Sequence, residues 1–207
     1  MSKGRLEAFS DGVFAIAITL LVLDLTVPKG QPDGGLWAAL GREWPSYFAY
    51  LVSFLVIGIM WVNHHTVFEK VRQVDRAVLF ANLALLLFTS VIPFPTRLVA
   101  EYLTAAGDAR VAMAVYSAVM TACAVCYGTL WLVITRDAGI LHVHLDRAAE
   151  RAALRRFGFG NLVYLATVGL SFLNPVATLA VHGAIAVYYC FDQLRTEGTG
   201  SAPDHPG

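Results

Sequence analysis

Long apolar segments occupy most of this chain, and they constrain its fold more than any other feature. A helix that crosses the hydrocarbon core of a membrane needs about 20 mostly apolar residues. Only 14% of the 207 residues are charged, against about a quarter in soluble domains. We therefore predict an all-α integral membrane protein whose domain covers residues 1–195. Six transmembrane helices are expected over about residues 9–27, 45–66, 77–94, 109–135, 157–173 and 176–194.

Proline and charge mark the boundaries of these segments. The first segment should end at Pro28, and the third at Pro93 and Pro95, because proline interrupts a helix. Only Asn174-Pro175 separates the last two segments, which predicts a helical hairpin. The charged stretch 146–156 predicts a surface helix or an extension of the fifth segment. Residues 196–207 are rich in Gly, Ser and Pro and predict a disordered tail.

The distribution of Lys and Arg predicts that both termini are cytoplasmic. With the N-terminus inside, the cytoplasmic side holds Lys3, Arg5, Lys70, Arg72, Arg76, Arg136, Arg147, Arg151, Arg155, Arg156 and Arg195. The outer side then holds only Lys29, Arg42, Arg97 and Arg110. Positive charge accumulates on the cytoplasmic side of membrane proteins. Asp11 interrupts the first apolar run and no small-residue cleavage motif follows it, so we expect a retained span rather than a signal peptide.

Polar residues should meet at the cytoplasmic level of the first three spans. Ser10 and Asp11 lie near the start of the first, Trp61, His64 and His65 near the end of the second, and Asn82 near the start of the third. A carboxylate inside a span needs a partner, so Asp11 should contact Arg5, His64, His65 or Asn82. A structural clamp that holds helix ends together is favoured over a proton-sensing or ion-binding role, although the two are compatible.

Metal and thiol chemistry have weaker support. His64 and His65 are adjacent and point about 100° apart on a helix, so they are poorly placed to share one ion. His142 and His144 are interpreted as exposed loop residues. We expect no metal site and no cofactor. Cys123 and Cys126 form a Cys-x-x-Cys pair, with Cys190 alone elsewhere, which gives a membrane thiol oxidoreductase little support. The net charge is zero, so nucleic acid is not an expected partner.

The first span also carries an apolar stripe. At 100° per residue, Ile16, Leu20, Leu23 and Val27 fall within about 60° of one another. Gly12, Phe9 and Arg5 continue the line, Thr19 lies at its edge, and Ser10 and Asp11 point elsewhere. Periodicity alone leaves two interpretations open, because such a stripe can pack against lipid or another helix, or can line a pore.

A longer motif makes the sequence more specific. Residues 5–25, which contain Arg5-x-x-x-Phe9-Ser10-Asp11-Gly12, closely resemble the first helix of prokaryotic members of the transmembrane protein 175 potassium-channel family. The Trp61-x-x-His64-His65 end of the second span resembles that family too. The resemblance covers the six-span layout, essentially residues 1–195.

The resemblance implies a homotetramer in the plasma membrane, with the first helix lining a central pore. Potassium would be the permeant ion, preferred over sodium, although the Thr-Val-Gly-Tyr-Gly filter of ordinary potassium channels does not occur here. Ile16 would form the narrow hydrophobic ring and Thr19 a hydroxyl layer with potassium in transit nearby. Leu20 and Leu23 would form further apolar rings. The network that braces the first helix would contain Arg5, Phe9, Ser10, Asp11, Trp61, Asn82 and either His64 or His65.

A secondary transporter or proton-conducting pathway is the alternative function. Asp11, Asp24 and the histidines would then form the relay, because ionisable residues inside spans mark such paths. No inverted repeat is visible in the sequence, which counts against a typical transporter. Asp24 could attract cations to an outer mouth, but solvation at the membrane interface is slightly favoured.

Overall fold

The described part of the chain is built from helices. The structure is a computed structural model that describes residues 2–28, 34–105, 107–136, 139–141 and 147–198, without side chains at 147–154, 156–157 and 191–198. Its elements are α1 (Lys3–Leu20), the 3-10 helix η1 (Leu21–Asp24), α2 (Gly35–Arg42), α3 (Trp44–Glu69), α4 (Arg76–Val91), α5 (Pro93–Tyr102), α6 (Asp108–Thr135), α7 (Arg147–Leu173) and α8 (Pro175–Gly198). Within these residues an isolated bridge between Val71 and Leu141 is the only β pairing. The predicted all-α class is confirmed.

Four helical stretches in the described residues are long and apolar enough to cross a membrane. They are Lys3–Asp24, Trp44–Glu69, Arg76–Tyr102 and Asp108–Thr135. The last two predicted spans appear as shorter apolar stretches, Gly158–Leu173 and Pro175–Cys190. The structure therefore supports a multi-pass membrane protein, and the count of six spans stays a prediction.

The first and third predicted spans have different limits in the structure. Helical structure begins at Lys3 rather than residue 9 and ends at Asp24 rather than residue 27. The third span continues past Pro93 instead of ending there. Because proline lacks a backbone N–H, the ladder is interrupted at Ile92, yet proline is well tolerated in the first turn of a new helix. The two pieces, α4 and α5, thus form one membrane-length rod from Arg76 to Tyr102.

Two connections also differ in detail from the predictions. The loop expected between the first two spans contains the eight-residue helix α2, which follows the left-handed residue Gly34 (φ 82°). The charged stretch 146–156 extends the fifth span, because α7 is one helix from Arg147. The predicted hairpin is present, and Asn174 accepts a hydrogen bond from the backbone N–H of Ala177 at the start of α8. Residues 199–207 and the histidines 142 and 144 lie outside the described residues.

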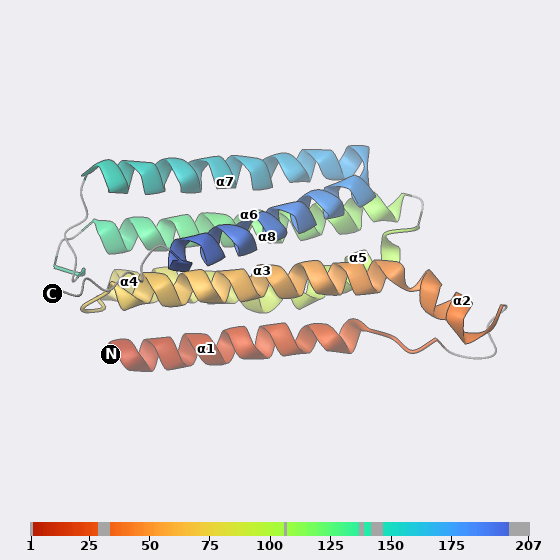
Figure 1. Cartoon of the computed structure of the whole chain (residues 1–207), viewed down its shortest axis with the longest axis horizontal. Helices are drawn as coiled ribbons and strands as arrows, with labels where there is room; N and C mark the ends of the chain where they lie inside the picture. Colours follow the sequence, from red (N-terminus) through yellow and green to blue (C-terminus); the bar gives the residue numbers. More distant parts are fainter. Residues whose placement is uncertain (1, 29–33, 106, 137–138, 142–146, 199–207) are drawn as a thin grey trace, which may run out of the picture.

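The long helices lie side by side along the long axis of the molecule (Figure 1). α1 packs against α3 and α4, while α6 packs most extensively against α7. Two buried apolar clusters fill the interior. One contains Phe14 and Tyr116, and the other contains Leu6 and Trp131. Because α1 contributes to both clusters, its inner face is fixed along most of its length.

A polar latch joins the loop before α4 to the end of α6. Asp75 caps α4 by accepting from the Val78 backbone N–H at 2.8 Å, and it pairs with Arg136. The Gln73 amide donates to the Gly139 carbonyl at 3.1 Å, and the Arg72 backbone N–H donates to the Ile140 carbonyl at 2.7 Å. These contacts hold the connection between α3 and α4 against the end of α6 and the residues that follow it.

Candidate functional site

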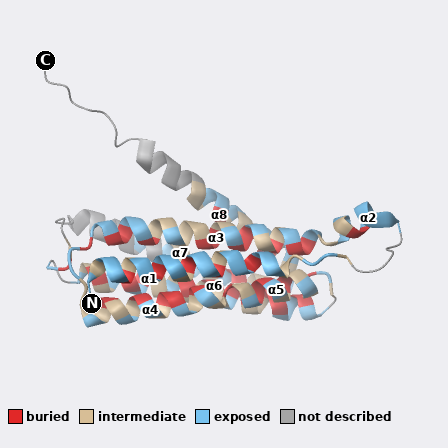
Figure 2. Cartoon of the chain, turned by 90° about the horizontal axis from the view of Figure 1, so that it is seen from below, coloured by how far each residue is buried: buried red, intermediate tan, exposed pale blue. Residues whose placement is uncertain are grey.

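The first helix has one buried face and one exposed face. Its buried residues recur every three or four positions, as expected for a single face of an α-helix: Leu6, Ser10, Phe14, Ala17 and Leu21. They contact α3 and α4. The opposite side of α1 is free within one subunit and is seen in pale blue in Figure 2.

The predicted stripe lies on this exposed face. Ile16 is 61% exposed, Leu20 42% and Leu23 73%, although all three are large and apolar. Val27, beyond the end of the helix, is 80% exposed. Such residues cover either lipid or another protein surface in a membrane protein. In a single copy of the chain, the stripe therefore remains exposed.

Thr19 adds a polar group to the exposed face. Its hydroxyl donates within α1, with carbonyl acceptors of Ala15 at 2.8 Å and Ile16 at 3.0 Å. The hydroxyl proton is thus used inside the helix, while the side chain remains exposed. A hydroxyl oxygen has two lone pairs, so Thr19 can still accept a hydrogen bond or contact a cation.

Three buried polar residues join α1, α3 and α4. The Asn82 amide N–H donates to Ser10 Oγ at 3.0 Å, and Asn82 Oδ1 lies 2.8 Å from His64 Nε2. Ser10 in turn donates to the Leu6 carbonyl at 2.9 Å. All three side chains are at most 1% exposed. Asn82 is the centre of this buried network because it bonds both of the other helices.

Aromatic rings enclose the buried histidine. The ring of His64 stacks on Phe68 at a centroid distance of 4.4 Å and lies 5.4 Å from the ring of Phe14. With its Nε2 bonded to Asn82, His64 is held between the inner face of α1 and the end of α3. Of the two candidate histidines, His64 is therefore the one that reaches the network.

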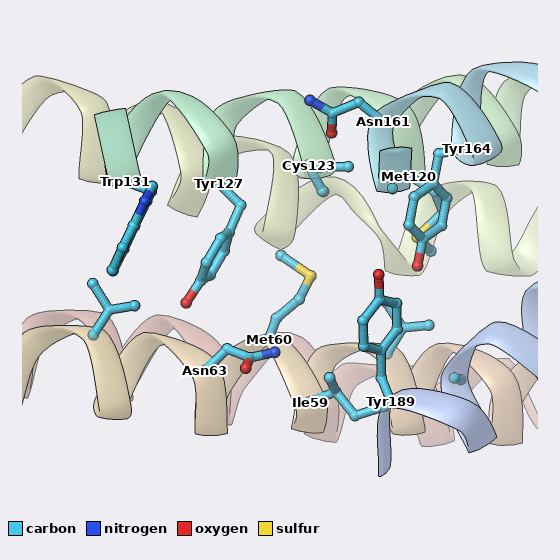
Figure 3. Close-up of a pocket in the computed structure, with 15 residues that line it drawn as sticks. Ile59, Met60, Asn63, Met120, Cys123, Tyr127, Trp131, Asn161, Tyr164 and Tyr189 are labelled. Carbon is cyan, nitrogen blue, oxygen red and sulfur yellow. The ribbon is translucent and has the colours of Figure 1, made fainter. Parts of the chain in front are cut away.

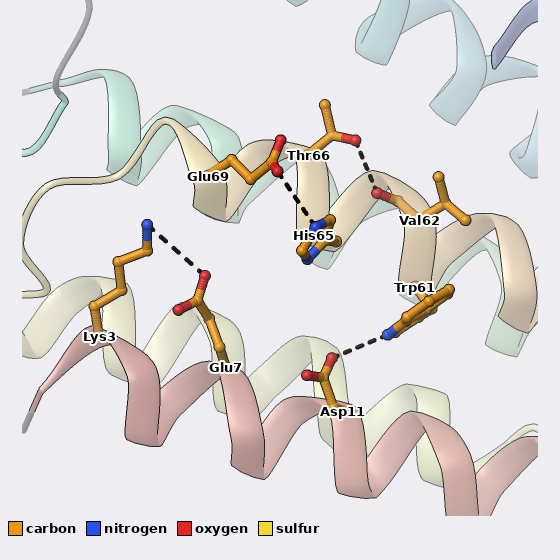
Figure 4. Close-up of polar contacts among 8 residues, drawn as sticks. All are labelled: Lys3, Glu7, Asp11, Trp61, Val62, His65, Thr66 and Glu69. Atoms are coloured by element: carbon orange, nitrogen blue, oxygen red, sulfur yellow. Dashed lines mark hydrogen bonds and ion pairs between the residues drawn. The ribbon is translucent and has the colours of Figure 1, made fainter. Parts of the chain in front are cut away.

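A second set of polar contacts lies nearer the surface, between α1 and α3 (Figure 4). Trp61 Nε1 donates to Asp11 Oδ1 at 2.9 Å. His65 stacks on Trp61 with ring centroids 6.4 Å apart and pairs with Glu69 at 3.4 Å. Asp11 thus has a partner, but it is Trp61 rather than Arg5, His64, His65 or Asn82. Trp61 and His65 are four residues apart and therefore lie on the same side of α3. The orientation of α3 about its own axis turns that side outward, next to Asp11.

Arg5 and Phe9 lie away from these contacts. Both are exposed, and they continue the exposed face of α1 toward the N-terminus. Lys3 and Glu7 form an ion pair at 3.8 Å one turn apart. Among the described residues no ion pair joins Arg5 to Asp11. The role of Arg5 and Phe9 in bracing the first helix therefore stays a prediction.

Asp24 lies at the C-terminal end of the first span. It is half-buried, and its Oδ2 atom is buried with no hydrogen-bond partner among the described residues. The charge of Arg97 on α5 acts on this carboxylate. Asp24 is therefore packed beside α5 rather than freely solvated, contrary to the interpretation favoured from the sequence.

A further buried polar cluster was not predicted. Ser53 on α3 bonds Thr96 on α5 at 2.8 Å and Tyr116 on α6 at 3.1 Å. Beside it, Ser117 bonds Ser171 at 3.2 Å and His182 at 3.1 Å. These residues come from five helices and share no local motif. No spacing in the sequence could have shown that they meet.

Comparison with known proteins points to one family. The sequence profile described as "Endosomal/lysosomal potassium channel TMEM175" matches residues 5–93, which include α1, α3 and α4. A protein of Streptomyces collinus named as a potassium channel is 55% identical over 93% of each chain. A second such protein, from Chamaesiphon minutus, is 42% identical over 90% of this chain and 92% of the other.

A solved structure and vertebrate proteins of the same family are also similar to this chain. The crystal structure of a lysosomal potassium-selective channel TMEM175 homolog from Chamaesiphon minutus superimposes with a TM-score of 0.81. It is 41% identical and covers 92% of this chain and 97% of that one. The human protein named endosomal/lysosomal proton channel TMEM175 is 43% identical over 45% of this chain but only 20% of its own length.

Proposed function

This chain belongs to the TMEM175 family of ion channels, and from that premise we propose that it is a potassium-selective cation channel. The exposed apolar stripe of α1 carries the proposal, because Ile16, Leu20 and Leu23 are large apolar residues that the described part of one chain leaves 42–73% exposed. Relatives of nearly the same length are named potassium channels. A thiol oxidoreductase is set aside, because the family consists of ion channels.

The proposed channel is a homotetramer in the plasma membrane. Each subunit crosses the bilayer six times, with α7 and α8 supplying the last two crossings and both termini in the cytoplasm. Four copies of α1 surround the central axis with Ile16, Leu20 and Leu23 directed inward. The buried face of α1 supports this arrangement, since α3 and α4 already hold it and leave the stripe free.

The stripe would act as a hydrophobic constriction. A ring of four isoleucine or leucine side chains offers no oxygen ligands, and it can close a pore by dewetting. Ile16 is proposed as the narrowest ring because, of the three stripe residues, it lies nearest the middle of the first span, Lys3–Asp24. Ions must pass such a ring partly hydrated. Potassium releases water more readily than sodium, so the ring favours potassium.

Thr19 is proposed to contribute to selectivity. Its hydroxyl oxygen lies on the exposed face and retains acceptor capacity after its proton is donated within the helix. Four such oxygens would offer a potassium ion direct ligands next to the apolar rings. Potassium in transit is the only ion that the proposal places here, and no cofactor is part of it.

Ser10, Asn82 and His64, with Asp11 and Trp61, are proposed to hold the pore helix in position. A buried network with every member bonded gives α1 one preferred rotation about its axis. That rotation decides which side chains face the pore. Arg5, Phe9 and His65 would support the same end of the helix from the surface.

A flux assay tests the function directly. Purified protein in liposomes should release potassium down a gradient, and it should pass sodium more slowly. Liposomes prepared with heat-denatured protein provide the control for leak. A preparation that is folded and tetrameric but passes neither cation at any pH would rule the channel out. Measurement of the mass of the detergent-solubilised assembly tests the tetramer separately.

Proton conduction is the second candidate. The vertebrate relatives are named proton channels. Asp11 lies in the N-terminal half of the proposed pore helix α1, and His64 packs against that helix from α3. A pH-sensitive dye inside potassium-loaded liposomes should report proton entry when potassium leaves. A transporter would show a proton flux that saturates and a fixed ratio of protons to the coupled ion. A channel would show neither.

A further inference from the structure

A cavity of about 440 Å³ lies inside the subunit, away from the proposed ion pathway (Figure 3). Its walls come from α3, α6, α7 and α8, and no residue of α1 lines it. Binding sites for small molecules usually measure about 300–1,000 Å³. The cavity is therefore large enough for a ligand and is separate from the network that braces α1.

The cavity is elongated along the helices. On α3 its lining runs from Val56 to Val67, and on α6 it runs from Met120 to Trp131. At 1.5 Å per residue, each of these stretches extends about 16 Å. Long parallel walls with valine, isoleucine and methionine side chains suit an extended alkyl chain better than a compact polar molecule.

The described part of the lining is uncharged, which restricts what the cavity can hold. Among the described residues that line it, none is Asp, Glu, Lys, Arg or His. The polar groups are two amides, Asn63 and Asn161, three tyrosines and one tryptophan. Burial of an unpaired charge is costly, so the cavity disfavours ions and charged headgroups. Neutral hydrogen-bonding groups on an apolar wall match an uncharged amphiphile.

The polar groups come from facing helices. In Figure 3, the hydroxyl groups of Tyr164 on α7 and Tyr189 on α8 point toward one another across the cavity. Asn161 lies one turn before Tyr164 on α7, and Asn63 approaches from α3. Hydroxyl and amide groups can both donate and accept, so they can bind an alcohol or ester head of either polarity.

The polar side of the cavity is formed by apolar stretches of α7 and α8 that are proposed to cross the bilayer. Tyr164, Asn161 and Tyr189 are half-buried, so the lining is not sealed from the surface. They lie within the apolar stretches Gly158–Leu173 and Pro175–Cys190. The neighbouring side chains of Phe159 and Leu162 are 70% and 66% exposed and apolar. In the proposed bilayer, the outer side of α7 would face the hydrocarbon layer, and that layer would supply the ligand.

We propose that this cavity is a binding site for an uncharged, single-chain amphiphile taken from the bilayer. The alkyl chain lies along Val56, Met60 and Met120, and the head is hydrogen-bonded by the asparagine and tyrosine side chains. The site is a property of each subunit, and it does not depend on the proposed potassium conduction.

Native mass spectrometry of the purified full-length protein tests the site with three probes of equal chain length. These are 1-monoolein, which is uncharged, oleate, which is an anion, and oleylamine, which is a cation. We expect 1-monoolein to bind saturably, and the two charged probes to bind at least about tenfold more weakly, because none of the described lining residues carries a charge that could pair with theirs. Equal binding of all three probes would overturn the proposal, as would no saturable binding of 1-monoolein.

Variants that fill the cavity locate the site. Ala124→Trp places a large ring in it from α6, and Gly160→Leu does so from α7, where an added Cβ would lie 3.4 Å from the Tyr189 hydroxyl oxygen. Both should abolish saturable binding of 1-monoolein. The matched controls Ala118→Trp and Gly158→Leu change exposed positions on the same helices and should retain it. If Ala124→Trp does not fold, Gly160→Leu alone serves as the test. Saturable binding of 1-monoolein to a folded variant that fills the cavity would contradict the assignment.

Discussion

Asn82 on α4 donates a hydrogen bond to Ser10 on α1 at 3.0 Å, and both side chains are 0% exposed. The same amide meets His64 of α3 through its oxygen at 2.8 Å. One side chain therefore ties the first helix to its two neighbours. The first prediction concerns this contact, because removal of Asn82 takes a hydrogen-bond partner from each of two buried side chains, Ser10 and His64.

Asn82→Ala should lower the free energy of unfolding by about 1–3 kcal/mol, the cost of leaving buried hydrogen-bonding groups without partners. Thermal unfolding in detergent, followed by circular dichroism, measures the loss. Ser90→Ala provides a control on the same helix, since Ser90 is exposed and bonds only the Leu87 carbonyl. If both variants melt at the temperature of the unmodified protein, Asn82 is not the centre of the network.

The two adjacent histidines should respond differently to replacement. His64→Ala removes a buried ring that bonds Asn82 and stacks on Phe68, so we expect a loss of about 2–4 kcal/mol. His65→Ala removes an exposed pair with Glu69 and should change stability by no more than about 1 kcal/mol. Denaturation of both variants under one set of conditions gives the comparison, and equal losses would contradict the assignment of His64.

Ile16→Asn should increase cation flux and reduce the preference for potassium over sodium. A polar side chain keeps the proposed constriction wet, which removes the barrier that an apolar ring creates. Flux of each cation is measured in proteoliposomes with equal amounts of protein. Leu132→Asn on α6 is the control, since it changes another exposed apolar residue outside α1. Equal effects of the two substitutions would show that the stripe does not line the pore.

Thr19→Val tests the hydroxyl layer without a change of shape. The Thr19 hydroxyl is exposed and bonded only within its own helix, so stability should change by less than about 1 kcal/mol. The ratio of potassium to sodium flux should fall, because four oxygen ligands are lost. The flux ratio and the melting temperature are measured on the same preparation. An unchanged ratio means that another layer sets selectivity.

The latch at Asp75 should lose strength in acid. A hydrogen bond from the Val78 backbone N–H is the main reason that the pKa of Asp75 lies below its usual value, and the Arg136 charge adds to the effect. A lowered carboxyl pKa stabilises the fold at neutral pH, and that stabilisation disappears as the pH falls below about 4 and through the folded-state pKa.

Asp75→Ala should therefore cost about 1 kcal/mol at neutral pH, as expected for loss of a helix N-cap. Melting temperatures of the variant and of the unmodified protein are compared at neutral pH and in acid. The difference between the two proteins should shrink as the pH falls. A difference that stays constant down to the acid limit would show that the Asp75 charge does not stabilise the latch.

Much of the architecture follows from local sequence patterns. Apolar length predicts the membrane class, and Asn174-Pro175 predicts the hairpin between α7 and α8. The continuation past Pro93 was missed because proline has opposite effects in two positions: it interrupts a ladder but fits the first turn of a new helix. The packing of α5 against α3 and α6 determines that helical structure continues beyond Pro93. That packing involves residues far from Pro93 in the sequence.

The sequence by itself determined that Ser10 and Asp11 point away from the stripe of Ile16, Leu20 and Leu23 on α1, because a period of 3.6 residues is a property of the helix alone. The tertiary structure decided which neighbours these sides of the helix meet. Adjacent residues point about 100° apart, so a modest rotation of α3 determines whether His64 or His65 faces inward. The same rotation gives Asp11 the partner Trp61. Packing against other helices sets that rotation, and the packing is distributed over residues far apart in the chain.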